Sequence, residues 1–252
     1  QEAGIHHAYA HFWLSYRITY ETQEKLIVSE PYNKRFPGKP VKFLDIVSAA
    51  DSAAYITHPT MGIKAEDFET LLRSIGGSWQ KTNLNCFTVF YNFKPPCGDE
   101  RKLREIPRNR WQVTASINAS NAPLMMDGKT NTVWASATAQ QPGMTVSVDM
   151  GAVQPLAKIR LDLGTVWCDY PRGSKIEIST DNQSWQTAFE YGDVTDGLFW
   201  DNAQPRFLVH GDFMTCTFAP LMARYVRITQ TGSDPRFHWT IAELRFFGPP
   251  SI

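Results

Sequence analysis

The sequence lacks a long hydrophobic run and a net charge of either sign. No stretch approaches the roughly 18 consecutive apolar residues that a membrane-spanning helix needs, and no signal peptide is recognisable at the start. The 25 basic residues equal the 25 acidic residues in number. Residues 1–110 carry 15 Lys and Arg against 12 Asp and Glu, whereas residues 111–252 carry 10 against 13. Because the basic residues are scattered, we expect a soluble chain that does not bind nucleic acid.

Cysteine is also scarce. The four residues divide evenly between the halves of the chain, and no C-x-x-C spacing of a zinc or redox site occurs. Four thiols permit three pairings, and the count also admits a reduced cytosolic state. Our prediction is one bridge in each domain, Cys86 with Cys97 and Cys168 with Cys216, as in an extracytoplasmic protein.

Recognisable catalytic patterns are missing as well. No serine lies in a nucleophile elbow, and the Gly76-Gly77 pair is not a phosphate-binding loop. The acidic cluster at residues 66–69 reads as charges at the start of a helix. His7 and His11 lie one turn apart if their segment is helical, but no carboxylate or cysteine nearby completes a metal site. We therefore expect no transfer or hydrolysis of sugars by this chain alone.

The second half of the sequence has the pattern of an all-β sandwich. Apolar and polar residues alternate over residues 144–150, 159–163 and 176–178, which predicts strands with one buried face. Turn-forming Gly, Pro, Asp and Asn separate these segments, and helical periodicity is weak. Six of the eight tryptophans also lie in this half, a composition that suits a sandwich core.

The first half predicts a small α/β domain over residues 1–96. Aromatic residues recur every three or four positions over residues 5–20, which predicts a helix packed on a sheet, and the chain starts abruptly inside it, as a piece of a longer protein would. Strands are expected at 25–29, 53–57 and 79–93, with a second helix at 64–75 that ends at the Gly76-Gly77 pair. Residues 97–110 are charged and contain proline, so we interpret them as a linker to a second domain at 111–252.

A spaced series of motifs in the second half resembles the discoidin domain, also called the coagulation-factor type C domain. The series runs from residue 111 to residue 248 and consists of WQVTAS (111–116), DG (127–128), TVW (132–134), VDMG (148–151), RYVRI (224–228) and IAELRFF (241–247). The resemblance implies a jelly-roll sandwich in which Trp111, Trp134 and Trp185 pack the core.

The resemblance also implies one structural Ca²⁺. In discoidin-like carbohydrate-binding modules, the loop that corresponds to residues 127–132, together with the Ala-Glu pair of the last strand, encloses such an ion. Ca²⁺ takes six to eight oxygen ligands. Carried over to this sequence, the ligand set comprises the side chains of Asp127 and Glu243, the hydroxyl or carbonyl of Thr132, and the carbonyls of Lys129, Asn131 and Ala242.

Sugar binding is the usual use of this fold in bacteria, whereas some animal members bind phospholipid head groups through apolar loops. A sugar site needs an exposed aromatic ring and polar side chains that bind hydroxyl groups. Asp201, Asn202 and Phe237 lie in expected loops, and Trp239 fits either a loop or the core. From the loop residues we select, as the sugar-binding set, Trp167, Tyr170, Arg172, Trp200, Arg206 and His238.

Residues 5–96 bear a second resemblance, carried by the run YAHFWLSYRITY (9–20), the segment EKLIV (24–28), the AAYI strand (53–56) and the closing FTVFY strand (87–91). These features resemble the soluble tail that follows the last membrane helix of some bacterial glycosyltransferases, which use polyprenyl-phosphate sugars. The resemblance implies an extracytoplasmic location, a membrane domain upstream in the same polypeptide, and a catalytic part that lies outside this sequence.

Three hypotheses of function follow. The first is a non-catalytic, extracytoplasmic tail of a membrane glycosyltransferase whose discoidin-like domain binds glycan. The second is a secreted carbohydrate-binding or adhesion protein, or the carbohydrate-binding appendage of a glycoside hydrolase. In the third, the discoidin-like domain has lost its ligand and braces the first domain.

Overall fold

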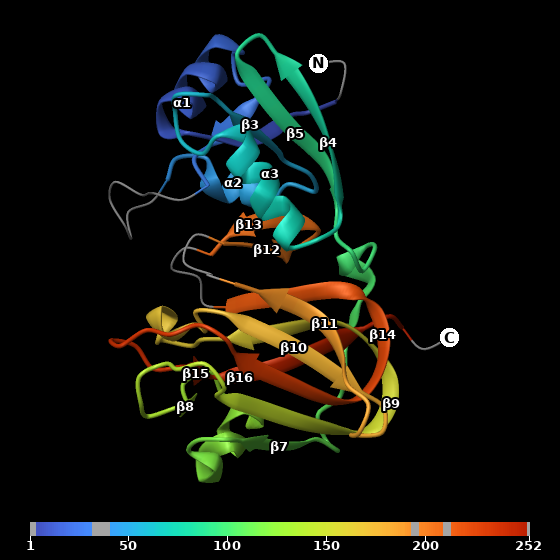
Figure 1. Cartoon of the computed structure of the whole chain (residues 1–252). Helices are drawn as coiled ribbons and strands as arrows, with labels where there is room; N and C mark the ends of the chain where they lie inside the picture. Colours follow the sequence, from blue (N-terminus) through green and yellow to red (C-terminus); the bar gives the residue numbers. More distant parts are fainter. Residues whose placement is uncertain (1–3, 32–40, 193–196, 209–212, 251–252) are drawn as a thin grey trace. The chain divides into compact units, whose positions relative to one another are not determined.

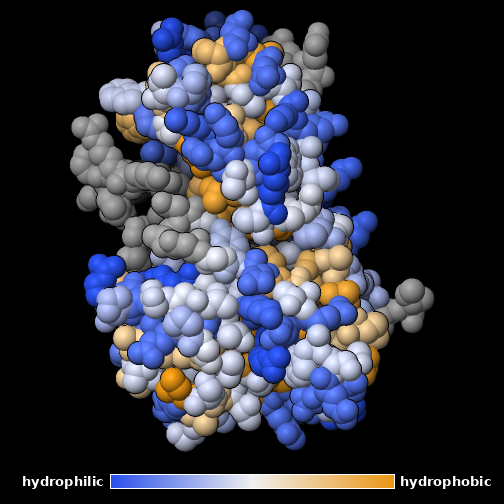
Figure 2. All heavy atoms as spheres, in the orientation of Figure 1, coloured by the Kyte–Doolittle hydropathy of each residue, from blue (hydrophilic) through white to orange (hydrophobic). Residues whose placement is uncertain are grey.

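The computed structural model describes residues 4–31, 41–192, 197–208 and 213–250, and the chain divides into two compact units (Figure 1). Unit 1 comprises Gln1–Pro95 and Asp201–Phe207, and unit 2 comprises Pro96–Trp200 and Leu208–Ile252. On the face shown in Figure 2, hydrophobic atoms form separate patches among hydrophilic side chains. Within the described ranges, no helix is both long and apolar enough to cross a membrane.

Unit 1 is a five-stranded sheet with helices, and its strand order is β2-β1-β3-β5-β4. Strand β1 pairs in parallel with β2 and β3, whereas β5 pairs antiparallel with β3 and β4. The elements in chain order are β1 (His7–Ala10), α1 (Phe12–Glu21), β2 (Ile27–Ser29), α2 (Leu44–Ala49), β3 (Ala54–Thr57), α3 (Ala65–Ser74), β4 (Ser78–Leu84) and β5 (Phe87–Lys94). The expected α/β class of this region is confirmed.

The single helix predicted for residues 5–20 is wrong in its first part. His7–Ala10 form strand β1, and helix α1 begins only after His11. The face of α1 that packs inward carries Leu14, Ser15 and Thr19, and the Thr19 hydroxyl accepts a hydrogen bond of 2.9 Å from the backbone N–H of Val28. These smaller side chains let the helix approach the sheet closely. The aromatic stripe therefore faces outward, with exposed fractions of 64%, 42% and 84% for its members Trp13, Tyr16 and Tyr20.

The strand expected over residues 79–93 is instead a hairpin, drawn in Figure 1 as the long β4–β5 ribbon. The reversal occurs at Asn85 and Cys86, where Asn85 adopts a positive φ of 54°. Asparagine tolerates this left-handed conformation better than most residues because its short side chain bonds the nearby backbone. The sequence alternation predicted the strand character, but it did not reveal this turn.

Seven residues of the later sequence belong to unit 1. Strands β12 (Leu198–Asp201) and β13 (Gln204–Phe207) form a two-stranded sheet, and Asp201–Phe207 group with the first unit. The Tyr55 hydroxyl donates a 2.7 Å hydrogen bond to the carbonyl of Pro205, and the Phe207 ring lies 6.1 Å from that of Tyr55. The predicted boundary, with residues 111–252 as one uninterrupted domain, is corrected accordingly.

Unit 2 is the expected jelly-roll sandwich. Its main strands are β7 (Gln112–Ala115), β9 (Thr145–Asp162), β10 (Ser174–Ser179), β11 (Gln186–Tyr191), β14 (Phe213–Gln230) and β16 (Glu243–Gly248). Shorter elements are η1 (Glu100–Lys102), β6 (Arg104–Glu105), η2 (Ala119–Met126), β8 (Trp134–Ala135), η3 (Trp167–Asp169) and β15 (Thr240–Ile241).

Two long strands, β9 and β14, take part in both layers of the sandwich. The first half of β9 pairs with β7, and its second half pairs with β16. β14 follows β9 in antiparallel register, with irregularities between Thr217 and Leu221 and between Ala223 and Tyr225. Such bulges bend a strand, so one hydrogen-bonded network yields two facing sheets. The separate strands expected before and after Gly151 are therefore parts of one element.

The core of unit 2 follows the predicted alternation. Val146, Val148, Ile159, Leu161 and Ile176 are each at most 1% exposed. The predicted motif tryptophans also pack inward: Trp111 lies 4.4 Å from Phe246, and Trp134 meets Trp239 edge to face at 5.3 Å. Trp185 is only half-buried, with the Arg227 guanidinium 4.3 Å from its ring. Trp239, which precedes β15, is fully buried and is thus a core residue.

The expected linker at residues 97–110 is part of the sandwich. Strand β6 extends the sheet beside β16, and the backbone N–H of Ile106 donates a 2.8 Å hydrogen bond to the carbonyl of Phe246. Glu100 is buried and forms an ion pair with Lys158. The charged residues that suggested a linker therefore have partners on the sheet.

The predicted disulfide pairings are wrong, because all four cysteines are free thiols in the structure. Cys86 is exposed in unit 1, whereas Cys97 falls in unit 2. Cys216 is buried on β14, where burial raises the pKa of its thiol to about 12. Burial also raises the pKa of Cys97 to about 11.

Candidate functional site

A cavity of about 510 Å³ opens on unit 2 beside the start of β10 and the segment after β14. Two aromatic residues, Tyr170 and Phe237, line it and are half-buried. The remaining lining residues are polar, charged or glycine: Arg172, Gly192, Thr231, Gly232, Ser233, Asp234 and Arg236. Aromatic surface next to a few fixed polar groups is typical of a small-ligand site.

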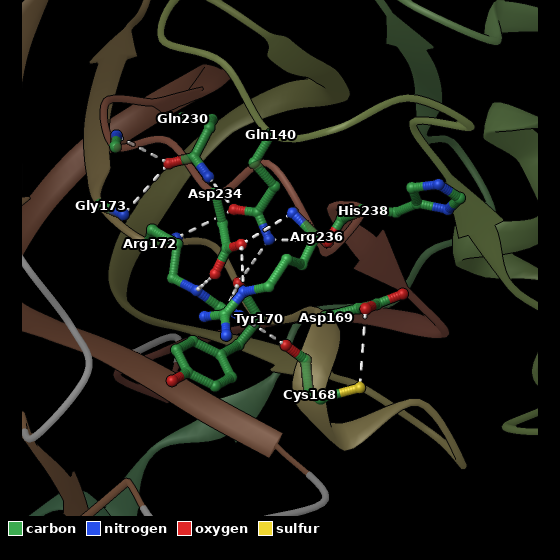
Figure 3. A network of polar contacts seen from close by, with 11 residues as sticks. Gln140, Cys168, Asp169, Tyr170, Arg172, Gly173, Gln230, Asp234, Arg236 and His238 are labelled. Carbon is green, nitrogen blue, oxygen red and sulfur yellow. Dashed lines mark hydrogen bonds and ion pairs between the residues drawn. The ribbon is translucent and has the colours of Figure 1, made fainter.

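A buried ion pair organises this pocket. The Nε of Arg172 donates to the carboxylate of Asp234 at 3.0 Å, and its other nitrogens donate to the carbonyls of Tyr170 at 2.8 Å and Cys168 at 3.0 Å (Figure 3). The guanidinium carbon lies 4.0 Å from the ring centroid of Tyr170 and 5.0 Å from that of Phe237. Because all three nitrogens of the Arg172 guanidinium donate hydrogen bonds, the group is fixed in position. It therefore helps to position the Asp234 carboxylate and the two aromatic rings.

Asp234 is the acidic member of the pair and is 7% exposed. The backbone N–H of Arg236 donates to its carboxylate at 2.9 Å. This hydrogen bond, followed by the contact with Arg172, lowers the pKa of Asp234 despite the opposing effect of burial. The carboxylate is therefore ionised at neutral pH.

Two buried amides, drawn in Figure 3, hydrogen-bond to the backbone around the pocket. Gln140 donates to the carbonyls of Tyr170 at 3.0 Å and His238 at 2.6 Å, and its oxygen accepts from the backbone N–H of Arg172 at 3.1 Å. Gln230 hydrogen-bonds to Gln140 and accepts from the backbone N–H of Gly173 at 3.1 Å. These contacts tie three loops to the sheet.

Glycine is required at position 232, where the chain passes against Arg172. A Cβ atom there would lie 2.7 Å from the Arg172 carbonyl carbon, which is closer than real contacts allow. The two loops that meet at the pocket can therefore pack only if this residue has no side chain.

Of the six predicted sugar-binding residues, the structure brings Tyr170 and Arg172 together at the pocket. His238 contributes its carbonyl to the network, but its exposed side chain points away from the other labelled residues in Figure 3. Trp167 begins η3, and its side chain lies outside the described part of the structure.

The remaining two positions need correction. Trp200 is not a loop residue: it lies on β12 with an exposed fraction of 1%, so its ring is covered by protein. Arg206 belongs to unit 1, where it donates to the Ser48 carbonyl at 2.7 Å and pairs with Asp201 at 3.1 Å. The sequence analysis selected Trp200 for its aromatic ring and Arg206 for its positive charge. The sequence of this short hairpin did not show which of its side chains would be buried.

Sequence reasoning missed Asp234 and Arg236. Both follow strand β14 in the segment TGSDPRF (231–237), whose Gly, Ser, Asp and Pro indicate a turn. The turn was recognisable, but the partner of Asp234 is 62 positions away in sequence. Only the fold brings Arg172 to it.

The predicted calcium loop does converge on Glu243. The Thr132 hydroxyl donates to the Asp127 carboxylate at 2.7 Å and lies 3.1 Å from the carbonyl oxygen of Lys129. Oxygens that share one Ca²⁺ at about 2.3–2.6 Å lie about 3 Å from one another, so this spacing fits the ion. Hydrogen bonding by Thr132 first, then by the Lys129 N–H and a contact with Glu243, lowers the pKa of Asp127.

Glu243 itself is fully buried. One of its oxygens accepts from the backbone N–H groups of Gly128 at 2.6 Å and Lys129 at 2.9 Å, and the other pairs with Arg108. The donor set of the loop therefore fits a cation, while the arginine already supplies one positive charge to this carboxylate. No contact is recorded for the side chain of Asn131, and Ala242 is a buried neighbour whose N–H donates to the carbonyl of Asp162.

Glycine at position 164 permits the loop to pack. A Cβ on Gly164 would lie 2.5 Å from the carbonyl oxygen of Thr130 and 3.1 Å from the Cβ of Ala242, and its φ of +59° is left-handed. The loop thus rests directly on the turn after β9. Throughout the described ranges, this loop included, no group of three or more His, Cys, Asp or Glu side chains is arranged to bind a metal, and His7 and His11 lie on different elements.

Comparison with known proteins gives one family and several similar structures. The chain is similar to chitosan-binding module 1 of a chitosanase/glucanase from Paenibacillus sp. IK-5, with 22% identity over 57% of this chain and 99% of the module and a TM-score of 0.44. It is also similar to the family 32 carbohydrate-binding module of Clostridium perfringens NanJ, which was solved in complex with galactose, with 20% identity, coverage of 57% and 98%, and a TM-score of 0.44. A search of curated proteins returned no match.

The family model of the F5/8 type C domain matches residues 112–244, which is more than half of the chain. The matched segment contains the bent strands β9 and β14, the pocket, and the loop that meets Glu243. Thus the chain belongs to the F5/8 type C domain family.

Proposed function

We propose that this protein binds glycan through the unit 2 pocket lined by Tyr170, Arg172, Asp234 and Phe237. One observation carries the proposal: two half-buried rings border a cavity whose charged groups are held by a buried ion pair. A pyranose offers an apolar C–H face for an aromatic ring and hydroxyl groups for fixed donors and acceptors. The solved modules named above bind chitosan and galactose according to their descriptions, which agrees with this class of ligand.

Phospholipid binding is the alternative ligand class within the family resemblance. It would require large apolar side chains at the loop tips. In the described part of unit 2, the exposed large apolar residues are Val153 and Met222. Both lie within the long strands β9 and β14 and not in the pocket loops. This placement supports glycan over lipid as the ligand.

The decisive experiment is a glycan-array screen followed by titration calorimetry of the positive glycans. We expect dissociation constants of about 10⁻⁴ to 10⁻³ M, which correspond to roughly 4 to 5.5 kcal/mol. Phe237→Ala removes a pocket ring and should weaken binding about tenfold. Tyr20→Ala removes an aromatic side chain that is 84% exposed in unit 1 and should leave binding unchanged. Silence across the array, or equal loss in both variants, would refute the proposal.

We further propose that the loop at 127–132 and Glu243 bind one structural Ca²⁺. Asp127, Thr132 and Glu243 would supply side-chain oxygens, and the Lys129 carbonyl lies beside them. The bound ion would supply positive charge that ties this loop to the start of β16. Because the loop lies outside the residues that line the pocket, we assign the ion to stability and not to ligand contact.

For the parent protein, we propose the extracytoplasmic tail of a membrane glycosyltransferase. The support is the resemblance of residues 5–96 to such tails, and weak binding suits this setting because tethering to a membrane enzyme raises the local concentration. The second candidate, a secreted adhesin or a glycoside hydrolase appendage, shares the same binding domain. The complete coding sequence separates them: about eight or more apolar spans upstream favour the first, and a signal peptide directly upstream favours the second.

A further inference from the structure

Among its described lining residues, the unit 2 pocket carries an excess of positive charge. They include two arginines, Arg172 and Arg236, but a single acid, Asp234, and the others are uncharged. The two arginines differ in environment, and this difference decides which of them is available to a ligand.

Arg172 is the neutralised member. Its side chain is 10% exposed and pairs with Asp234 at 3.0 Å. Two backbone carbonyls accept hydrogen bonds from its other two nitrogens. A guanidinium that is enclosed in this way has its charge balanced and its position fixed. It shapes the pocket more than it attracts ions.

Arg236 is the surplus cation. Its side chain is 76% exposed and approaches Asp234 only at 3.5 Å, through an oxygen that also accepts the Arg236 backbone N–H. The guanidinium carbon lies 5.4 Å from the ring centroid of Phe237. An aromatic ring and an accessible cation thus lie within contact range of each other and border the same cavity.

We propose that the pocket prefers a glycan whose sugar ring bears an anionic group, a carboxylate or a sulfate. The inference rests on the proposed glycan function. Phe237 would contact the apolar face of the ring, and Arg236 would bind the anionic oxygens through the two-pronged geometry that guanidinium offers to such groups. Gly232 lets the two loops that border the cavity pack against each other, since a Cβ there would lie 2.7 Å from the Arg172 carbonyl carbon.

The test is titration calorimetry with three ligands of similar length: oligogalacturonate, its neutral methyl ester, and a sulfated galactan oligosaccharide. We expect at least one anionic ligand to bind about tenfold tighter than the neutral ester, and this advantage to shrink as salt rises from about 0.05 to 0.5 M. The uronate and sulfate arms identify which anion the pocket accepts.

Two variants locate the effect. Arg236→Gln should remove most of the anionic preference, so that the anionic ligands and the neutral ester bind with about equal affinity. Arg17→Gln is the matched control, because the Arg17 side chain is 75% exposed in unit 1 and lies far from the pocket in sequence. It should alter neither affinity.

The outcomes separate the two proposals. Equal affinity for charged and neutral ligands, or a preference that survives Arg236→Gln, overturns the anionic preference while glycan binding stands. Absence of binding to all three ligands and to every glycan on the array overturns both.

Discussion

Two of the buried carboxylates of unit 2 that pair with an arginine, Glu243 and Asp234, serve different ends. Glu243 pairs with Arg108 and with the loop at 127–132, and its side chain has no exposed surface. Asp234 pairs with Arg172 beside a cavity of about 510 Å³. The first cluster, which we call the Glu243 cluster, is closed. The second, the Asp234 cluster, borders open space with aromatic rings and a second, exposed arginine.

The comparison shows that a buried ion pair is not by itself a functional signal. Burial of two charges costs desolvation energy, which is recovered only when hydrogen bonds satisfy both groups. Both clusters meet that condition through backbone N–H groups. The two clusters differ because, in the described part of unit 2, only the Asp234 cluster borders a cavity. Side chains that line this cavity, such as Phe237 and Arg236, are also partly or largely exposed.

The largest expected effect is on stability in the Glu243 cluster. Glu243→Gln removes the buried charge partner of Arg108, which keeps only a 3.9 Å contact with Glu105, and breaking a buried pair in this way costs about 3–5 kcal/mol. Asp234→Asn retains an acceptor for Arg172 and should cost only about 1–2 kcal/mol, but it should weaken glycan binding. Urea unfolding followed by tryptophan fluorescence measures the first effect, and calorimetry measures the second.

The arginine side of the same pair provides a control for this prediction. Arg108→Gln should lower the urea midpoint nearly as much as Glu243→Gln, whereas Arg110→Gln, at an exposed neighbouring position, should leave it in place. If Asp234→Asn proved more destabilising than Glu243→Gln, the assignment of the two clusters would be reversed.

The second prediction concerns calcium at the Glu243 cluster. A ligand that binds only the folded state at about 100 times its Kd stabilises it by about 2.7 kcal/mol. Addition of CaCl₂ should therefore raise the melting temperature relative to excess chelator, and Asp127→Asn should abolish the increase. Asp234→Asn should keep it. An identical melting curve with and without chelator, together with the absence of metal by elemental analysis, would eliminate the calcium site.

The third prediction concerns acid. Arg224 hydrogen-bonds to Asp149 at 2.8 and 2.9 Å, which lowers the pKa of Asp149, and the pKa of Asp234 is also lowered. A carboxyl group whose pKa is lower in the folded state stabilises the fold above its unfolded value of 3.8. That stabilisation disappears as the pH falls through the lower, folded value.

We therefore expect the urea midpoint of unit 2 to be steady from about pH 7 to 5 and to fall below about pH 4. Asp149→Asn should make the decline shallower, since one of the linked carboxyl groups no longer titrates. A midpoint at pH 3 equal to that at pH 7 would contradict the assignment of these carboxylates.

The smallest expected effect is chemical and leaves the fold intact. At about pH 8, a thiol reagent should modify exposed Cys86 first and buried Cys216 only after unfolding, because the thiolate is the reactive form. The denatured, unreduced protein should yield four thiols. A count of two or none would restore the disulfide pairings that the structure does not show.

Much of unit 2 could be predicted from local sequence. Period-two alternation marked Val146, Val148 and Ile159 as core residues, and they are buried. The resemblance to discoidin-like modules implied that the loop at 127–132 meets Glu243, and hydrogen bonds from Gly128 and Lys129 join them. Local pattern succeeds here because each strand buries one face, whichever strand lies beside it.

Two features of the fold could not be predicted from the local sequence pattern. The aromatic residues of α1 have helical spacing, but the spacing cannot show which face turns toward a sheet when both faces carry some apolar residues. The charged segment at 97–110 resembles a linker by composition, yet the sheet supplies partners such as Lys158 for Glu100. In both cases the partner surface, which comes from distant sequence, determined the outcome.

The sequence by itself indicated the family, the sandwich strands and the meeting of the loop at 127–132 with Glu243. The strands follow from alternation within short segments, and the family and the loop follow from motifs that resemble a known domain. Only the tertiary structure decided the pocket. It buried Trp200, assigned Arg206 to unit 1, and joined Arg172 to Asp234 across 62 positions of sequence. A binding site depends on which loops meet and which side chains remain uncovered, and both are consequences of long-range packing that no short segment encodes.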